Sequence, residues 1–328
     1  MKISANEDSN IPCLASHCLG PLHQLEEALL AFQSVTENWL REQWRKTPAP
    51  FYSSVDLRNA GFKLAPVDTN LFPAGFNNLN DRFISLAVQA AQETLERLLP
   101  GCLRILLIPE NHTRNSFYFE NLSTLQDILE KAGFEVRIGS LLEEMPHAKE
   151  IVLASGARIT LEPIVRVADQ IKVKDFLPCC ILLNNDLANG IPEILQGIEQ
   201  TILPNMNLGW HSRLKSNHFR HYAQVAGEFA QLLGLDPWLI TPLFSRCAEV
   251  DFMQREGEAC MMQESQQILH ATQKKYDQYH IKEKPYVVIK ADAGSYGMGV
   301  LSIHEPDEIQ QLNRKKRSDM MVSKGSRS

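Results

Sequence analysis

The chain has 328 residues, which allows one large domain or two to three of ordinary size. Its hydrophobic share of 44% and charged share of 22% are typical of a soluble globular protein, and no apolar run is long enough to span a bilayer. A net charge of −6 gives no reason to expect nucleic acid as a partner. Because the first residues lack the apolar core of a signal peptide, we expect a cytoplasmic protein.

The seven cysteines are scattered along the chain and odd in number. No Cys-x-x-Cys pair is followed by a second pair at the spacing of a zinc site. Because free cysteine packs as a small hydrophobe, we expect these residues to be free thiols, buried or at the surface, rather than metal ligands.

The N-terminal part predicts two helices separated by a long polar segment. Apolar residues recur at helical spacing in residues 21–44 and again in 79–99. Residues 46–78 are rich in Pro, Gly, Asn and Asp, yet their aromatic side chains argue against disorder, and a short strand is expected at 54–57. The expected buried face of the second helix is Phe83, Leu86, Ala90 and Leu95.

Strands and helices alternate in the middle of the chain. Buried-strand patterns cover residues 103–108 and 134–138. Between them lies a predicted helix at 122–132, which Gly133 would end. This strand–helix–strand order predicts a parallel sheet.

Two more strand signals follow. Residues 151–154 and 159–167 predict a hairpin that turns at Gly156. Residues 179–183 predict a buried strand, which runs into the polar triplet 184–186. Open α/β sheets bind ligands just past their strand ends, so we expect ligand contacts at this triplet.

Three further helices are predicted in the C-terminal part. One covers residues 222–233 and ends at Gly234, and a polar, glutamine-rich helix covers 251–279. The third opens with acidic residues at 305–308 and carries the basic run 314–317 in its last turn. Both placements suit the helix dipole.

The most informative segment joins two apolar, strand-like runs through a glycine-rich turn at residues 286–303. Glycines let backbone N–H groups approach oxygen atoms, and Lys290 at the end of the first run adds a point charge. The lysine precedes the glycines, whereas it follows them in a P-loop and in a protein kinase, which argues against both. The alternative is an ordinary hairpin with a flexible tip.

This hairpin resembles the small-domain loop of ATP-grasp enzymes. The resemblance implies that Lys290 contacts the ATP phosphates as the catalytic lysine. Lys215 is similar to the second phosphate-binding lysine, which that fold carries on an earlier strand. The alternative is a solvated lysine in a basic stretch with Arg213 and Arg220. The flap residues implied to bind ATP are Gly294, Ser295, Tyr296, Gly297, Met298 and Gly299.

Longer blocks resemble the uncommon, proteobacterial type of glutamate–cysteine ligase that is related to ATP-grasp enzymes. The resemblance implies an α/β, ATP-grasp-like fold. It further implies a helical and α/β substrate-binding domain with a parallel sheet at 1–208, and a nucleotide-binding region at 209–328 that is truncated at its C-terminus. The blocks that carry the resemblance are 54–79, 108–115, 182–186, 209–219 and 290–299.

An amino-acid substrate needs donors for its α-carboxylate and a carboxylate for its α-ammonium group. In the first block Arg58 and Asp68 can fill these roles, and in the second block Arg114 and Glu110 can. The alternative is that these polar residues only hold loops through bonds from side chain to backbone. The complete expected substrate-binding set is Arg58, Asp68, Asn70, Asn77, Asn78, Glu110, Arg114, Asn115 and Asn185.

The resemblance implies an ATP-dependent glutamate–cysteine ligase that forms γ-glutamylcysteine through an acyl phosphate, the first step of glutathione biosynthesis. It implies ATP and Mg²⁺ as cofactors, and glutamate and cysteine as small-molecule substrates. The family's acidic-x-Asn metal pattern is absent after the flap, so we expect a truncated chain and assign no metal ligand. The alternatives are another ATP-grasp carboxylate–amine ligase, or a non-catalytic remnant that binds an amino acid or nucleotide.

Overall fold

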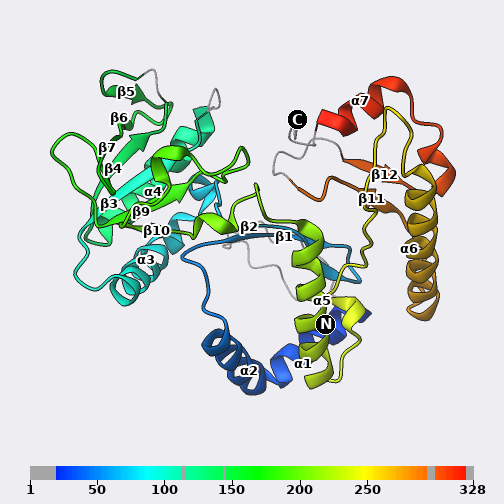
Figure 1. Cartoon of the computed structure of the whole chain (residues 1–328). Helices are drawn as coiled ribbons and strands as arrows, with labels where there is room; N and C mark the ends of the chain where they lie inside the picture. The colour runs from blue at the N-terminus through cyan, green and yellow to red at the C-terminus, as the bar shows by residue number, and fades with distance from the viewer. Residues whose placement is uncertain (1–19, 112–115, 143–144, 294–299, 323–328) are drawn as a thin grey trace. The chain divides into compact units, whose positions relative to one another are not determined.

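The computed structural model describes residues 20–111, 116–142, 145–293 and 300–322 (Figure 1). The chain forms two compact units, and each is built from more than one segment. Of the described residues, unit 1 comprises those in Ala49–Ser54 and Asn70–Gly209, and unit 2 comprises those in 20–48, Val55–Thr69 and 210–322. Two N-terminal segments therefore fold together with the C-terminal part of the chain.

Unit 1 is a mixed α/β unit built on one mostly parallel sheet. Its helices and strands are α3 (Ile84–Leu98), β3 (Arg104–Pro109), α4 (Ser116–Lys131), β4 (Glu135–Ser140), β5 (Lys149–Val152), β6 (Arg158–Pro163), β7 (Val165–Val167), β8 (Gln170–Lys172), β9 (Cys180–Asn184) and β10 (Thr201–Leu203). Six strands form the sheet in the order β10-β9-β3-β4-β6-β5. Within it only the edge pair β5–β6 is antiparallel.

Both faces of this sheet are buried. On β3, Ile105 and Leu107 belong to one apolar core, whereas Leu106 and Ile108 belong to another. Residues of α3 and α4 complete the first core, and loop residues such as Phe72 complete the second. Because side chains alternate across a strand, a strand buried on both faces is apolar throughout, which is the pattern of these sequences.

Unit 2 contains, among the described residues, five helices and two strand pairs. They are α1 (Pro21–Ala31), α2 (Gln33–Lys46), β1 (Ser54–Asn59), β2 (Leu64–Asn70), α5 (Lys215–Leu232), α6 (Glu258–Gln278), β11 (Val287–Ile289), β12 (Leu301–Ile303) and α7 (Arg314–Val322). The strand pairs are β1–β2 and β11–β12. Within the described part of the chain, no helix combines the length and the apolar character needed to cross a membrane.

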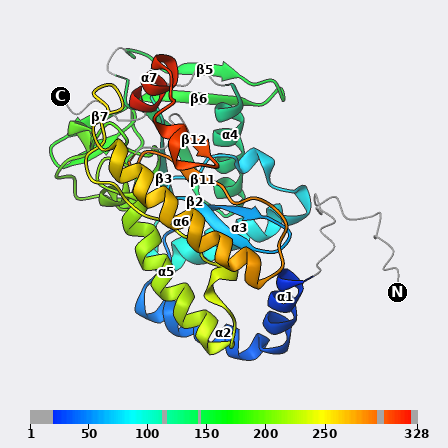
Figure 2. The ribbon, with the colours of Figure 1, turned by 90° about the vertical axis from the view of Figure 1, so that its right-hand side faces the viewer.

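Helix α6 packs on the β11–β12 pair (Figure 2). Met261 of α6 shares a buried apolar cluster with Val287 and Ile303, which pair across the two antiparallel strands. The last paired residue of β11 is Ile289. Lys290 therefore leaves the pair from a strand end that is fixed by packing.

The structure confirms the predicted parallel sheet and most of the predicted strands. The strand predicted at 159–167 is divided, because β6 ends at Pro163 and β7 pairs with β8 in a separate sheet. Strands β3, β4 and β9 lie on the three apolar runs and pair in parallel. The hairpin predicted around Gly156 is β5–β6, and Gly156 has the positive φ of +86° that such a turn requires. The hairpin predicted from residues 286–303 is the antiparallel pair β11–β12.

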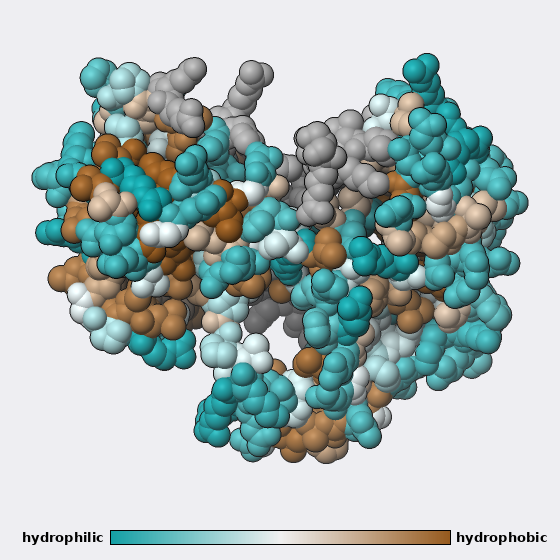
Figure 3. Space-filling model, in the orientation of Figure 1, coloured by the Kyte–Doolittle hydropathy of each residue, from teal (hydrophilic) through white to brown (hydrophobic). Residues whose placement is uncertain are grey.

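The helix predictions are wrong in their bounds. Helices α3, α4 and α6 begin at Ile84, Ser116 and Glu258 instead of 79, 122 and 251. The helix predicted at 21–44 is two helices that meet at Phe32, whose backbone leaves the helical region. Helix α5 begins at Lys215, so this lysine opens a helix and does not lie on a strand. The helix predicted from 305 is a short 3₁₀ turn at Pro306–Ile309 followed by α7. The basic run 314–317 therefore lies in the first turn of α7, where Figure 3 shows a hydrophilic surface.

The predicted buried face of α3 is also largely wrong. Phe83 and Leu86 are 45% and 57% exposed, and Ala90 is exposed as well. The buried residues are Ala91 and Leu95. The large side chains of Phe83 and Leu86 suggested the wrong face, whereas the true face combines the small Ala91 with Leu95 and packs against α4.

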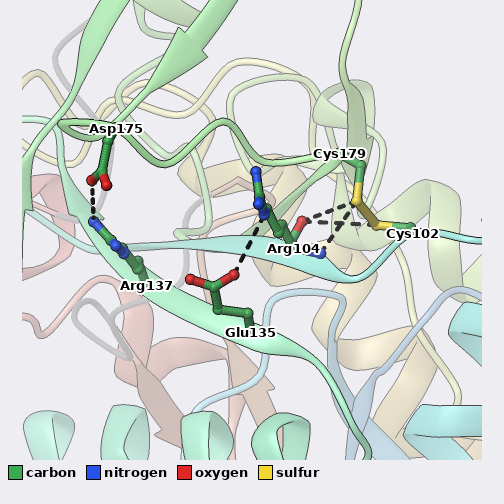
Figure 4. A network of polar contacts seen from close by, with 6 residues as sticks. All are labelled: Cys102, Arg104, Glu135, Arg137, Asp175 and Cys179. Carbon is green, nitrogen blue, oxygen red and sulfur yellow. Dashed lines mark hydrogen bonds and ion pairs between the residues drawn. A yellow bond between two sulfur atoms is a disulfide. The ribbon is translucent and has the colours of Figure 1, made fainter.

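A disulfide joins Cys102 to Cys179, so the expectation of free thiols is wrong for these two residues (Figure 4). They precede the neighbouring strands β3 and β9, and their Cα atoms lie 5.7 Å apart, within disulfide range. Arg104 is close by, and its amide donates to Sγ of Cys179 at 3.3 Å. The free cysteines of the described residues are Cys180, Cys247 and Cys260.

The buried sheet predicts the effect of truncating a core side chain. Leu107 is fully buried, so Leu107→Ala should lower the free energy of unfolding by about 2–5 kcal/mol. The control is Leu103→Ala, because Leu103 is 65% exposed and adjoins the same strand; its effect should stay below about 0.5 kcal/mol. Urea unfolding followed by circular dichroism measures both. Equal losses in the two variants would contradict the assigned core.

Candidate functional site

Unit 1 brings polar side chains together where β3 and β9 end. The two strands are neighbours, and Pro109 pairs with Asn184 in their register. The residues that come directly after the two strands therefore lie close together. Glu110 Oε1 accepts a hydrogen bond from the Asp186 amide at 2.7 Å. Asn185 Nδ2 donates to the Pro109 carbonyl at 3.2 Å. Glu110 and Asp186 are called the carboxylate pair below.

The carboxylate pair lies in a largely buried environment. Asp186 is only 6% exposed. Burial, and after it the charge of Asp186, raise the pKa of Glu110 to about 7, although the hydrogen bond from the Asp186 amide opposes the rise. Glu110 is therefore partly protonated at neutral pH. A cation placed beside it would favour its ionised form.

Buried asparagines hold the loops around the carboxylate pair. Asn121 Oδ1 accepts from the amides of Gly75 and Phe76 at 2.8 and 3.0 Å. Its Nδ2 donates to Asn184 Oδ1 at 3.1 Å, and Asn184 Nδ2 donates to the Pro73 carbonyl at 2.7 Å. These two asparagines are 1% and 2% exposed, so their amide groups hold the loops in place and are not accessible to a ligand. Asn121 gave no sequence signal, because it lies on α4 among ordinary polar residues.

Two tyrosine hydroxyls fix the same strand ends. Tyr118 accepts from the Glu110 amide at 2.9 Å and donates to the Asn184 carbonyl at 2.7 Å. Tyr52 donates to the Leu183 carbonyl. Burial raises the pKa of both tyrosines well above the usual value, so both hydroxyls stay protonated and act as donors.

The predicted asparagines differ in their surroundings. Asn70 Oδ1 accepts from the Phe72 amide at 2.9 Å, and Asn185 Oδ1 accepts from the Leu187 amide at 3.0 Å. These contacts match the alternative interpretation, in which polar loop residues hold turns. Asn77 and Asn78 are exposed on a 3₁₀ turn, Phe76–Asn78. Arg114 and Asn115 lie outside the described residues.

Unit 2 gathers cationic side chains around Trp210, which is 5% exposed. Lys215 Nζ lies 4.3 Å from the centre of the Trp210 ring, and Arg213 Cζ lies 4.8 Å from it. Both distances allow a cation–π attraction. Lys290 Nζ donates to the Val67 carbonyl at 2.5 Å. Arg213, Lys215 and Lys290 are called the cationic cluster below.

Strand β2 orients Arg213. One guanidinium nitrogen of Arg213 donates to the Thr69 carbonyl at 3.0 Å, and the other donates to the Thr69 hydroxyl. The planar guanidinium is thus held by two bonds to one residue and by the face of Trp210. Arg213 and Trp210 were missed as site residues. Their signal was the block 209–219, in which two cations follow a tryptophan.

Asp68 supplies a negative charge to the cationic cluster. Burial lowers the pKa of Arg213, and the charge of Asp68 opposes that change. Burial also lowers the pKa of Lys215; the charge of Asp68 opposes this, whereas the charge of Lys290 adds to it. Asp68 was expected to hold a substrate ammonium group, and in unit 2 its charge acts on the protein's own cations.

His218 of α5 lies within the reach of the same charges. Burial lowers its pKa first, and the positive charge of Arg213 lowers it further. Its Nε2 atom is buried and has no hydrogen-bond partner among the described residues. The imidazole is therefore neutral at physiological pH.

Several predicted site residues are not part of either cluster. Arg58 is exposed on β1. The flap residues 294–299 lie outside the described part of the chain. Among the residues that the structure describes, no group of three or more His, Cys, Asp or Glu side chains is placed to hold a metal ion.

The two clusters differ in the chemistry that they can support. The cationic cluster offers two ammonium groups and a guanidinium, which suit phosphate or carboxylate oxygens. The carboxylate pair suits an ammonium group.

Comparisons with known proteins agree on one family. A family model described as GshA, glutamate-cysteine ligase, matches residues 26–328. A similar solved structure is that of a protein provisionally named gamma-glutamylcysteine synthetase, from Methylobacillus flagellatus KT, with 49% sequence identity and a TM-score of 0.89. The match covers 94% of this chain and 73% of that one. No curated protein is matched.

Glu110→Gln should change how stability depends on pH. The folded pKa of about 7 exceeds the usual value of 4.5, so the native state binds more protons than the unfolded state between these values. Parent stability is therefore lost as pH rises from 4.5 through 7. The variant lacks this loss. Its free energy of unfolding, measured relative to that of the parent, should therefore rise by at most about 3 kcal/mol from pH 4 to pH 8.

Urea unfolding at pH 4, 6 and 8 measures this difference. Glu93→Gln is the control, because Glu93 is exposed on α3 in the same unit, and its effect should be the same at all three pH values. A difference between parent and Glu110→Gln that does not vary with pH would contradict the buried carboxyl group.

Proposed function

The chain belongs to the glutamate–cysteine ligase family, and from this premise we propose that it joins glutamate to cysteine with ATP. The product would be γ-glutamylcysteine, which makes the reaction the first step of glutathione biosynthesis. All three substrates are small molecules.

The cationic cluster is the observation that supports the nucleotide part of this proposal. Lys215 and Lys290 come from different parts of the chain, yet they lie close enough that the charge of Lys290 adds to the effect of burial in lowering the pKa of Lys215. Holding like charges close together is unfavourable unless an anion lies between them. The phosphates of ATP are such an anion. We therefore assign Lys290 as the catalytic lysine and Lys215 as its partner.

The proposed chemistry proceeds in two transfers. The γ-carboxylate of glutamate attacks the terminal phosphorus of ATP, which forms an acyl phosphate and releases ADP. The amine of cysteine then attacks the acyl carbon, loses a proton and expels phosphate. The protein forms no covalent bond in either transfer. Its contribution is to position the reactants and to neutralise the charge that develops on the phosphate oxygens.

We assign the phosphates to unit 2 and an amino-acid ammonium group to the carboxylate pair of unit 1. The ATP-grasp-like character of unit 2 is part of the proposal, and the end of β11 at Ile289, just before Lys290, supports it. The flap 294–299 keeps its proposed role as a source of backbone N–H donors. We expect Mg²⁺ to accompany ATP, but we assign it no protein ligand.

Lys290→Ala should lower kcat/KM for ATP by about 10²- to 10³-fold, because it removes a preorganised positive charge from the reacting phosphate. The control is Lys284→Ala, since Lys284 is exposed shortly before β11, and it should keep the parental value. Phosphate release with saturating glutamate and cysteine measures both variants. Parental turnover in Lys290→Ala would refute the assignment of this lysine.

Binding of the amino-acid substrate should release protons if its ammonium group lies beside Glu110. With a pKa of about 7, Glu110 is half protonated at pH 7, so about half a proton should leave when a cation ionises it fully. Calorimetric titration in buffers of different ionisation enthalpy measures this number, which should rise at pH 6 and fall at pH 8. Glu110→Gln should abolish it. A binding enthalpy independent of the buffer at pH 6 and 7 would place the ammonium group elsewhere.

A further inference from the structure

The start of α5 is held by a carboxylate from a distant part of the chain. Asp292 Oδ1 accepts from the Ser216 amide at 2.7 Å, and Asp292 Oδ2 accepts from the Ser216 hydroxyl at 2.8 Å. The main-chain carbonyl of Asp292 accepts from the Lys215 amide at 2.8 Å. The residue at the usual capping position, Leu214, makes no side-chain cap. Two N–H groups of the first turn, those of Lys215 and Ser216, are thus bonded to one distant residue.

A third segment joins this contact. Arg246 Nε lies 2.9 Å from Asp292 Oδ2. The Asp292 side chain is 27% exposed, so its charge is only partly screened by water. One carboxylate therefore links three parts of unit 2, which are the exit from β11, the start of α5 and the segment before α6.

Asp292 lies next to both lysines of the cationic cluster in the chain or through a hydrogen bond, so it affects how they are placed. Lys215 is the first residue of α5, and Lys290 stands two residues before Asp292. Fixing the Lys215 amide to the Asp292 carbonyl sets the distance between the two lysine backbones. The charge of Asp292 also favours the protonated form of Lys215, against the effect of Lys290.

We propose that Asp292 is a positioning residue that holds Lys215 and Lys290 as one phosphate-binding pair. This inference rests on the proposed function, in which the two lysines bind ATP. A residue that only capped α5 would affect folding alone. A positioning residue affects ATP binding, and does so through Lys215.

The test is equilibrium binding of ATP with Mg²⁺ to the full chain, followed by calorimetry. Asp292→Asn should weaken ATP binding about tenfold, because it removes charge-assisted bonds to the start of α5. In the Lys215→Ala background the same change should weaken binding less than about twofold, since the lysine that it positions is gone. Asp307→Asn is the matched control, because Asp307 is exposed in the same unit, and it should leave the affinity unchanged.

Ser216→Ala provides a second and milder variant should Asp292→Asn fail to fold. It removes one of the two bonds that Ser216 donates to the carboxylate, so it should weaken ATP binding about threefold in the parent and not in Lys215→Ala. Equal weakening in both backgrounds, or none in the parent, would overturn the positioning role. If Lys215→Ala and Lys290→Ala themselves left ATP affinity unchanged, the proposed nucleotide site would fall, and this inference with it. If they weakened binding while Asp292→Asn and Ser216→Ala did not, only the inference would fall.

Discussion

Two ammonium groups repel each other wherever a fold holds them close, and the arrangement of unit 2 follows from that repulsion. Lys215 is held against the face of Trp210, and Lys290 is bonded to the carbonyl of Val67. The carboxylate of Asp68 offsets part of the remaining positive charge. Such an arrangement is stable without ligand, yet it still favours an anion, because bound phosphate oxygens would remove the repulsion altogether. The fold thus holds a positive site that suits an anion.

In unit 1, burial acts on a carboxyl group, whereas in unit 2 it acts on amines. A parallel sheet ends in Glu110 and Asp186, and burial there raises the pKa of a carboxyl group instead of lowering that of an amine. The side chains of the surrounding asparagines, above all Asn121 and Asn184, form hydrogen bonds with backbone groups and with each other. These amide groups are therefore hydrogen-bonded within the protein, and Glu110 is the group whose protonation a ligand can change.

Part of this structure could be predicted from the sequence. Apolar runs bounded by glycine and polar residues placed β3, β4 and β9, because a strand buried on both faces has a strong local signature. The start of α5 could not be placed, because its first turn has no local cap and takes its partner from Asp292. The disulfide was missed for the same reason, since 77 residues separate its cysteines and only the sheet brings them together. The pattern of residues likewise suggested Lys290 and Glu110, whereas the roles of Arg213 and Trp210 depend on tertiary contacts.

The bridge between Cys102 and Cys179 has a consequence for handling this molecule. The disulfide closes a covalent ring that contains α4 and six strands, from β3 to β8. A protease that cuts once inside the ring leaves both pieces attached, and a denaturing gel run without reductant shows a band of intact mass. Such a nick becomes visible only after thiols are added, so purity judged under oxidising conditions overstates the integrity of the backbone.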